Sequence, residues 1–244
     1  MDGKFSTSEP LNAIILAGGL GTRLRSVVNS LPKCMAPVRG KPFLHYLLHY
    51  VARFPVSKVV LSVGYLREVI FDWVEKNEKA FPFAIDYAIE ETPLGTGGGV
   101  KKALLGCDTE TVLVLNGDTY YNINVNAFYD AHRASKKNIS LALKPLCDFD
   151  RYGNVELDKN HVVTEFCEKK YCEQGHINGG IYLLKRRGLL DAMPDKFSFE
   201  SDFLQPQAKK GSVNGFVSDA YFIDIGVPAD YERADREFVN FEAL

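Results

Sequence analysis

The sequence predicts an α/β fold: a doubly wound, mostly parallel (Rossmann-like) sheet with a small antiparallel extension. Two observations lead to this expectation. Over residues 12–137, short apolar runs alternate with segments whose apolar residues repeat at helical spacing, which is typical of a doubly wound sheet. From Asn138 onwards the apolar runs follow one another with shorter connections, as antiparallel strands do.

The first half contains four apolar runs that we expect to be buried strands of a parallel sheet. They cover residues 12–16, 58–63, 83–89 and 111–115. Helices are expected at residues 43–53, at 66–79, and after the loop at residues 90–99 as far as Leu105. The proline-bracketed segment 31–38 is too irregular for a helix.

The second half is expected to add strands that cover the open side of this sheet. Strands are predicted at residues 139–143, 155–157, 162–166, 177–184 and 220–225, and helices at 186–192, 199–209 and 228–239. Pro228 suits the first position of the last helix, where the N–H that proline lacks would have no partner. No linker composition divides the chain, so residues 1–244 are expected to form a single domain.

Composition and charge exclude several classes of protein. The net charge of −2 gives no reason to expect a nucleic-acid partner. No apolar run approaches the roughly 18 residues of a membrane span, and residues 1–10 lack the apolar core of a signal peptide, so we expect a cytoplasmic protein. The five cysteines fit reduced thiols better than a disulfide framework. The oligomeric state stays open, a homo-oligomer included.

A glycine-rich loop, LAGGLGTRL at residues 16–24, follows the first predicted strand. Its three glycines let backbone N–H groups approach an anion, and Arg23 adds a forked cation suited to phosphate oxygens. An ordinary turn would also explain the glycines, and neither GxxxxGK[ST] nor GxGxxG is present. However, the loop at residues 90–99 and Asp118 also follow predicted strands, and ligands bind at the carboxyl ends of such strands. This convergence favours a phosphate-binding loop.

Together these motifs resemble the signature of the sugar-1-phosphate nucleotidyltransferases. The resemblance covers about residues 12–240, in the order that the family has. After the glycine loop it runs through PKCMAPV (32–38), GKP (40–42), PLGTGG (93–98), NGD (116–118), EK (168–169), NGG (178–180) and DIG (224–226). Within the family, the sequence is most similar to the D-glycero-α-D-manno-heptose 1-phosphate guanylyltransferases. One departure is Cys34, where many relatives have a second proline.

The resemblance implies an enzyme that joins an NTP to a sugar 1-phosphate and releases pyrophosphate. GTP and D-glycero-α-D-manno-heptose 1-phosphate are the favoured substrates, and GDP-heptose for bacterial surface polysaccharide is the favoured product. Residues 12–137 would form the nucleotide-binding core, and residues 138–240 the sugar-phosphate-binding part and the closing elements. Other pairs stay open: mannose 1-phosphate with GTP, or glucose 1-phosphate or another hexose 1-phosphate with UTP, CTP or dTTP.

The resemblance assigns nucleotide binding to the glycine loop and to segments that follow the predicted strands. These residues are Leu16, Ala17, Gly18, Gly19, Gly21, Thr22, Arg23, Lys33, Glu90, Pro93, Gly95, Thr96 and Asp118. Arg23, Lys33 and Asp118 would be catalytic. Arg23 would offset charge on the departing pyrophosphate, and Lys33 would stabilise the α-phosphoryl transition state, because this reaction depends on positioning and charge neutralisation.

The resemblance also implies a metal site and a sugar site. Asp118 and Asp224 each end an apolar strand and would hold one Mg²⁺. Lys169 would bind the sugar phosphate, and Glu168 would accept hydrogen bonds from sugar hydroxyls. The full set of expected sugar-phosphate-binding residues is Gly117, Tyr152, Gly153, Glu168, Lys169, Asn178, Gly179 and Asp224.

The preference for guanine rests on Glu90. This residue lies five positions before Gly95, where the family places a side chain that faces the base. A carboxylate only accepts hydrogen bonds, so it suits the adjacent N1–H and N2–H donors of guanine. Uracil or cytosine could instead be read by backbone groups, with Glu90 or Glu91 turned to solvent.

Two rival functions remain at this stage. A glycosyltransferase would use a DxD motif, and Asp148-Phe149-Asp150 has that sequence. This segment does not follow the buried strand that Asp118 follows, so it is discounted as a metal motif. A regulatory subunit that senses an NDP-sugar could dispense with Arg23, Lys33 or an aspartate, and this chain has them all. An active nucleotidyltransferase is therefore the favoured interpretation.

Overall fold

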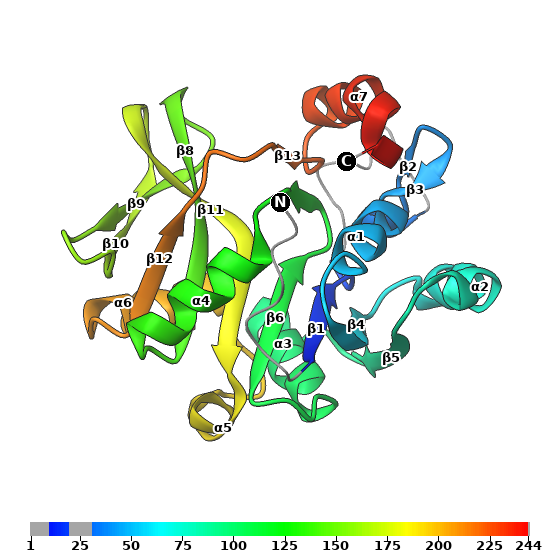
Figure 1. Ribbon diagram of the computed structural model, residues 1–244, viewed down its shortest axis with the longest axis horizontal. Helices are drawn as coiled ribbons and strands as arrows, with labels where there is room; N and C mark the ends of the chain where they lie inside the picture. Colours follow the sequence, from blue (N-terminus) through cyan, green and yellow to red (C-terminus); the bar gives the residue numbers. More distant parts are fainter. Residues whose placement is uncertain (1–9, 20–30, 244) are drawn as a thin grey trace.

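The computed structural model describes residues 10–19 and 31–243, and a seven-stranded sheet runs through it in the order β12-β8-β11-β6-β1-β4-β5 (Figure 1). The strands are β1 (Leu11–Leu16), β4 (Val56–Val63), β5 (Ala84–Ile89), β6 (Thr111–Asn116), β8 (Ile139–Phe149), β11 (Cys172–Lys185) and β12 (Val213–Val217). Strand β11 is antiparallel to both of its neighbours, and the other four pairs are parallel. The mostly parallel α/β fold that the sequence predicts is confirmed.

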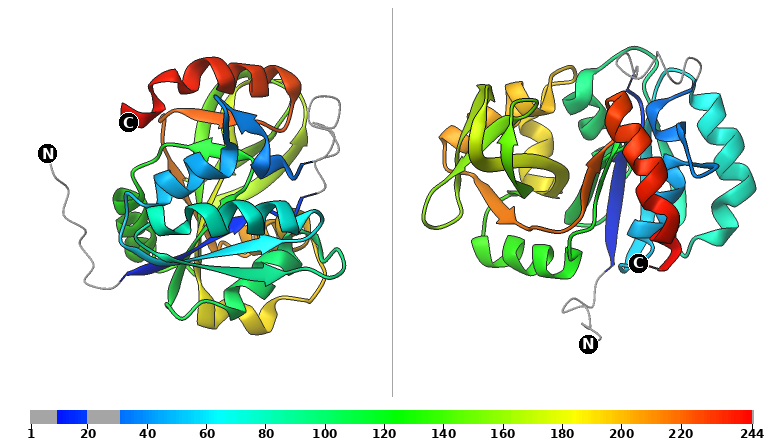
Figure 2. Two further views of the ribbon diagram at one scale, coloured as in Figure 1. Left: turned by 90° about the vertical axis from the view of Figure 1, so that its right-hand side faces the viewer. Right: turned by 90° about the horizontal axis from the view of Figure 1, so that it is seen from above.

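Helices cover both faces of the sheet (Figures 1 and 2). On one face lie α1 (Phe43–Val51), α2 (Arg67–Asn77), α4 (Val125–Ser135) and α7 (Pro228–Glu237). On the other lie α3 (Gly95–Leu105), α5 (Arg186–Leu189) and α6 (Gln205–Lys209). The short helices are η1 (Lys33–Met35), η2 (Glu78–Ala80), η3 (Leu190–Ala192), η5 (Phe238–Ala243) and the π-helix η4 (Phe199–Leu204).

The alternation of side chains along β1 explains why its sequence is almost wholly apolar. Ile14 belongs to the core on the α3 side, whereas Ala13 and Ile15 belong to the core on the α1 side. All three are fully buried. A central strand covered by helices on both faces needs apolar residues at successive positions, so the continuous apolar run becomes a buried parallel strand, as predicted.

The second half continues the sheet, whereas the sequence analysis expected it to cover the open side. Strand β11 pairs with both β6 and β8, so it joins the two halves of the chain in one sheet. Leu141 and Leu183 are fully buried, Leu141 in the core on the α3 side and Leu183 in the core on the α1 side, so both faces of this part of the sheet are covered. Strand β8 is also longer than expected, because residues 144–149 continue to pair with β11. The separate antiparallel sheet consists of β9 (Gly153–Leu157) and β10 (Val163–Lys169).

Two further short antiparallel pairs stand beside the main sheet. One joins β2 (Pro37–Val38) to β3 (Lys41–Pro42), and the other joins β7 (Thr119–Tyr121) to β13 (Phe222–Asp224). In the second pair Asp224 lies opposite Thr119, the residue that follows Asp118. This pairing brings the two aspartates of the expected metal site to one place, although they are far apart in the sequence.

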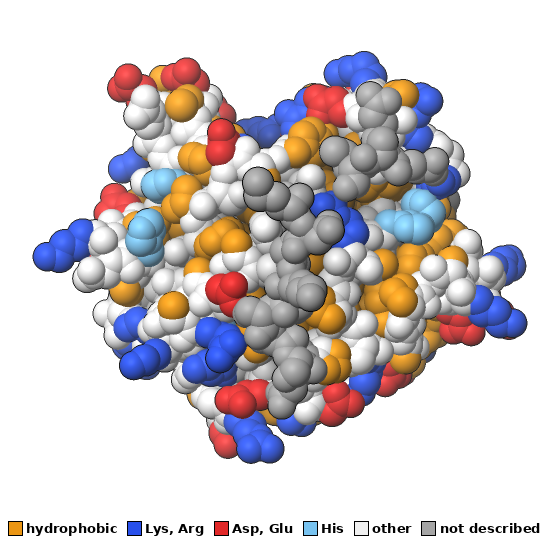
Figure 3. Space-filling model, viewed as in Figure 1, with side chains coloured by type: hydrophobic (Ala, Val, Ile, Leu, Met, Phe, Trp, Pro, Cys, Tyr) orange, Lys and Arg blue, Asp and Glu red, His pale blue; other side chains and the backbone are white. Residues whose placement is uncertain are grey.

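An ion pair links the two lobes that rise at the upper edge of the molecule. Figure 3 shows this edge hollowed between the lobe of β8 and β9 and the lobe of α7. Arg151, between β8 and β9, pairs with Asp230 of α7, and Arg233 lies 3.3 Å from the same carboxylate. Lysine, arginine and acidic side chains are interspersed on the face shown. Among residues 10–19 and 31–243, no helix combines the length and apolar character needed to cross a membrane.

Candidate active site

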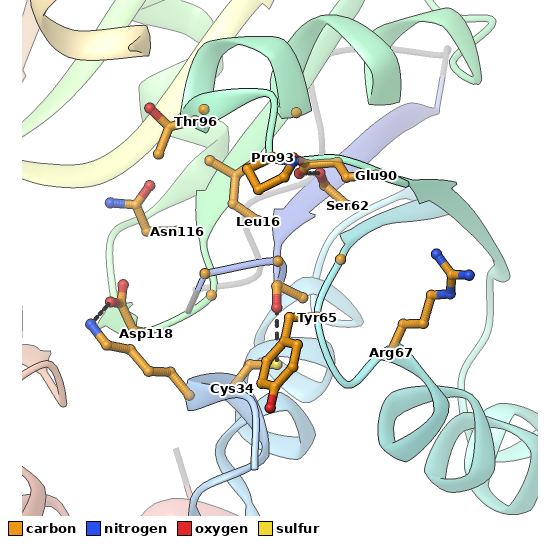
Figure 4. A pocket seen from close by; sticks show the side chains of 18 of the residues that line it. Leu16, Cys34, Ser62, Tyr65, Arg67, Glu90, Pro93, Thr96, Asn116 and Asp118 are labelled. Atoms are coloured by element: carbon orange, nitrogen blue, oxygen red, sulfur yellow. Dashed lines mark hydrogen bonds and ion pairs between the residues drawn. The ribbon is translucent and has the colours of Figure 1, made fainter. Parts of the chain in front are cut away.

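A cavity of about 740 Å³ opens where β1, β4, β5 and β6 end (Figure 4). Because these strands run parallel, their carboxyl ends meet at the same edge of the sheet. The predicted nucleotide-binding residues that the structure describes all line it: Leu16, Ala17, Gly18, Gly19, Lys33, Glu90, Pro93, Gly95, Thr96 and Asp118. Gly21, Thr22 and Arg23 lie outside the described residues.

A close contact between the backbones that end β1 and β6 forms part of the wall of this cavity. The N–H of Gly117 donates to the carbonyl of Leu16 at 3.1 Å. A Cβ atom on Gly117 would lie only 2.3 Å from that carbonyl oxygen, so no other residue fits here. Gly117, which the sequence analysis assigned to the sugar phosphate, therefore lies in the wall of the main cavity.

Lys33 and Asp118 form an ion pair at the edge of the cavity (Figure 4). The Nζ atom of Lys33, in η1, lies 2.9 Å from Oδ2 of Asp118, which follows β6. The two side chains are 21% and 30% exposed, so both remain accessible from the cavity. This pair places a cation where an incoming phosphate would need its charge neutralised.

Asp224 adds a second carboxylate beside this pair. Its Oδ1 accepts a hydrogen bond from the N–H of Gly226 at 2.7 Å, and its Oδ2 accepts one from the Tyr152 hydroxyl at 3.4 Å. Burial raises the pKa of Asp224, and the negative charge of Asp118 raises it further, while Lys33 acts in the opposite direction. Two carboxylates that repel each other form an oxygen donor set that suits Mg²⁺, a hard cation.

Glu90 is held by two donors at the opposite side of the cavity. The Ser62 hydroxyl donates to Oε1 at 3.2 Å, and the N–H of Leu94 donates to Oε2 at 3.1 Å. A Cβ atom on Gly99 would lie 2.8 Å from Oε1, so a glycine is needed to leave room for the carboxylate. A carboxylate has about four lone-pair sites, so Glu90 can still accept hydrogen bonds from a base.

The sequence analysis missed several residues that line the main cavity. Ser62 comes from the end of β4, Gly64 and Tyr65 from the turn that follows it, and Arg67 from the first position of α2. Tyr65 is 60% exposed, and Arg67 pairs with Glu91 at 3.1 Å. The signal was present in the sequence, because Ser62 is a polar residue within an apolar run and the run is followed directly by a glycine.

Cys34, the departure from the family's pattern, lies buried beside Ala17, just after the end of β1. Its thiol donates to the carbonyl of Ala17 at 3.9 Å, and the residue is 1% exposed. Burial, followed by the charge of Asp118, raises the pKa of the Cys34 thiol to about 12. The cysteine therefore packs as a small neutral side chain at this position.

The expected sugar-binding residues are divided between two places. Gly153, Glu168 and Lys169 line a second cavity of about 220 Å³, whereas Tyr152 contacts Asp224 of the carboxylate pair. Asn178 and Gly179 line neither cavity. The Asn178 amide donates to the Tyr182 hydroxyl at 2.9 Å, and a Cβ atom on Gly179 would lie 2.5 Å from the Tyr121 ring. Their roles in binding stay predictions.

The fold and the strand-end site together define a nucleotidyl transferase. The sequence matches the nucleotidyl transferase family over residues 12–240, and the chain belongs to this family. It is 43% identical over 232 residues to D-glycero-alpha-D-manno-heptose 1-phosphate guanylyltransferase of Aneurinibacillus thermoaerophilus, covering 95% of this chain and 100% of that protein. The protein of the same description from Campylobacter jejuni is 45% identical over 222 residues, with 91% and 97% covered.

Solved structures agree with this assignment. The crystal structure of HddC from Yersinia pseudotuberculosis superposes with a TM-score of 0.84 at 38% identity, covering 93% of this chain and 99% of that one. The crystal structure of HddC complexed with GMP-PN gives the same values. The family resemblance and the expected class of enzyme are thus confirmed, and the glycosyltransferase alternative is set aside.

The raised pKa of Asp224 predicts a pH-dependent cost in stability. The folded state binds this proton more tightly than the unfolded state, so the group favours folding below the ordinary carboxyl pKa of about 4 and opposes it as the pH rises through the raised value. We expect Asp224→Asn to unfold at a higher temperature than the wild type at pH 7, with a difference that shrinks on acidification. Thermal melts between pH 4 and pH 8 measure this.

The matched control for this variant is Asp108→Asn. The pKa of Asp108 is lowered, mainly by its hydrogen bond with Lys58, so this substitution should give no gain in melting temperature at pH 7. A melting temperature for Asp224→Asn at or below that of the wild type at pH 7 would show that the carboxylate pair is not repulsive.

Proposed function

We propose that the protein transfers GMP from GTP to D-glycero-α-D-manno-heptose 1-phosphate, producing GDP-heptose and pyrophosphate. The observation that carries this proposal is its 43% and 45% identity, over nearly the whole chain, to two guanylyltransferases of that sugar phosphate. The carboxylate of Glu90, which two hydrogen bonds hold in place, supports guanine as the base of the NTP, because a carboxylate only accepts hydrogen bonds. The proposal includes a cytoplasmic location and leaves the number of subunits open.

The main cavity supports this reaction by position and charge. Its volume of about 740 Å³ lies within the range of cavities that hold cofactors and nucleotides. An oxygen of the sugar phosphate forms a bond to the α-phosphorus, the bond between the α-phosphorus and its bridging oxygen breaks, and pyrophosphate leaves with the electron pair. Lys33 stabilises the negative charge of the α-phosphoryl group, and Gly18 and Gly19 allow the backbone to approach the phosphates. Arg23 is assigned to the leaving pyrophosphate on the family resemblance.

We further propose that Asp118 and Asp224 hold one Mg²⁺. The ion would neutralise charge on phosphate oxygens during transfer. The raised pKa of Asp224 supports this assignment, because burial raises it and the negative charge of Asp118 raises it further, so the two carboxylates lie near enough to interact. Lys33 compensates part of this charge through its contact with Asp118.

A substrate panel tests the proposal directly. GTP, UTP, CTP, dTTP and ATP are each combined with heptose, mannose and glucose 1-phosphates, and pyrophosphate release is followed with Mg²⁺ and with excess EDTA. We expect the highest kcat/KM for GTP with D-glycero-α-D-manno-heptose 1-phosphate, and loss of turnover in EDTA. A clear preference for another pair would replace the proposed substrates, and undiminished turnover in EDTA would remove the metal from the mechanism.

Lys33→Ala tests the proposed catalytic cation. We expect kcat to fall about 100- to 1,000-fold, because one positioned charge in the transition state is lost, while GTP binds with little change. Steady-state kinetics and GTP titration separate the two effects. Lys58→Ala is the matched control, since Lys58 also forms a 2.9 Å ion pair with an aspartate but lies outside the cavity lining. A near-normal kcat for Lys33→Ala would exclude this residue from catalysis.

Glu90→Gln tests the reading of guanine. The glutamine keeps the size of the side chain but replaces one acceptor by a donor, which opposes the N1–H and N2–H groups of the base. The ratio of kcat/KM for GTP to that for UTP should fall about 10- to 100-fold. Glu91→Gln, which alters the neighbouring carboxylate paired with Arg67, should leave this ratio unchanged. An equal loss for both nucleotides in Glu90→Gln contradicts a role in base selection.

A further inference from the structure

The second cavity is distinct from the nucleotide cavity and is lined mainly by polar groups. Its volume of about 220 Å³ corresponds to roughly seven water molecules at liquid density. Strand β10 contributes Glu168 and Lys169 from one side, and the segment around the π-helix η4 contributes Ser198, Glu200 and Ser201 from the other. The family resemblance assigned roles to Glu168 and Lys169 of β10 and to Gly153 of β9, so the η4 side of this cavity has no assigned function.

The η4 segment is anchored by its apolar side chains. Phe199 and Phe203 are both buried, and their rings stack with centroids 5.8 Å apart. Ser198 begins the helix and accepts a hydrogen bond from the N–H of Ser201. π-Helices are rare and occur frequently at functional sites, because the wide turn displaces side chains from their α-helical positions. The result is that Glu200, between two anchored positions, lines the cavity.

The hydrogen bonds of the η4 segment also connect it to the first turn of α3. The N–H of Phe199 donates to the Thr96 hydroxyl at 3.0 Å, and the N–H of Gly97 donates to the carbonyl of Phe197 at 3.0 Å. Thr96 lines the main cavity. Glu200 is therefore attached to the same framework that forms the nucleotide site, and its position relative to that site is fixed.

The charge environment of Glu200 agrees with this placement. The residue lines the cavity and is exposed, and partial burial of its carboxylate raises its pKa. The ammonium of Lys169 and the amide of Asn178 act in the opposite direction, so the carboxylate lies near both. A partly desolvated acceptor beside the expected phosphate-binding lysine suits the hydroxyl groups of the same substrate.

We propose that the second cavity receives the hydroxyl-bearing end of the sugar phosphate, and that Glu200 determines specificity for a seven-carbon sugar. The inference rests on the proposed function. A heptose differs from a hexose by one additional hydroxyl-bearing carbon, so its side chain ends in a vicinal diol. A carboxylate can accept hydrogen bonds from both hydroxyls, and Ser198 and Ser201 can donate or accept further ones. A hexose lacks the second hydroxyl of this diol, so it forms fewer hydrogen bonds with this side of the cavity than the heptose does.

The test compares Glu200→Gln with the wild type in two reactions, GTP with the heptose 1-phosphate and GTP with mannose 1-phosphate. We expect kcat/KM for the heptose substrate to fall about 10- to 100-fold, the value for mannose 1-phosphate to change little, and the KM for GTP to stay the same. Glu165→Gln is the matched control: it makes the same change at an exposed position of β10 that does not line the cavity, and it should preserve the ratio of the two sugars.

The outcomes separate the inference from the function on which it rests. A wild-type protein that does not use the heptose 1-phosphate with GTP overturns the proposed function. A wild-type protein that does so, together with an unchanged sugar ratio in Glu200→Gln, overturns the role of Glu200. An equal loss for both sugars would show that Glu200 only supports the structure, and would also overturn its role in specificity. Thermal melts check that Glu200→Gln is folded. The smaller change Ser201→Ala gives a second test, because it should also lower the ratio of kcat/KM for the heptose substrate to that for mannose 1-phosphate.

Discussion

The close contact between the carboxyl ends of the parallel strands β1 and β6 is the one on which the arrangement of the site depends. Here the N–H of Gly117 donates to the Leu16 carbonyl, and a Cβ atom at position 117 would lie only 2.3 Å from that oxygen. The chain can therefore turn immediately after β6 and present Asp118 at the sheet edge. Lys33 reaches Asp118 from η1, and β13 brings Asp224 from near the end of the chain. A residue larger than glycine at position 117 would force β1 and β6 apart at this end and so disturb the placement of Lys33, Asp118 and Asp224.

The carboxylates around the nucleotide cavity have contrasting environments, and these environments suit different tasks. Glu90 receives hydrogen bonds from Ser62 and from the N–H of Leu94, which fix its orientation before any ligand arrives. Burial raises the pKa of Asp224, and the negative charge of the neighbouring Asp118 raises it further. A fixed acceptor suits recognition of a base, whereas a pair of crowded carboxylates suits a cation. The fold thus uses strand ends on both sides of the cavity for different chemistry.

The sequence predicted the parts of the site that depend on local patterns. The buried strands, the loop glycines and Asp118 were found because apolar runs end where polar residues begin, and the parallel arrangement brings those ends together. Glu200 and Ser62 were missed because their contacts come from residues distant in the sequence, and each resembles an ordinary polar residue when read alone. The pairing of β11 with β6 was missed for the same reason, since an antiparallel strand buried on both faces has the same pattern as a parallel one.

The burial of Cys34 has a consequence for the chemical durability of the site. Thiolates attack electrophilic phosphorus and sulfur centres and react with peroxides, whereas protonated thiols are far less reactive. With a pKa of about 12, the Cys34 thiol is ionised in roughly one molecule in 100,000 at pH 7. A potential nucleophile can therefore lie beside Ala17 in the lining of the main cavity and remain unreactive. The same protonation protects this part of the protein from oxidants that modify exposed cysteines.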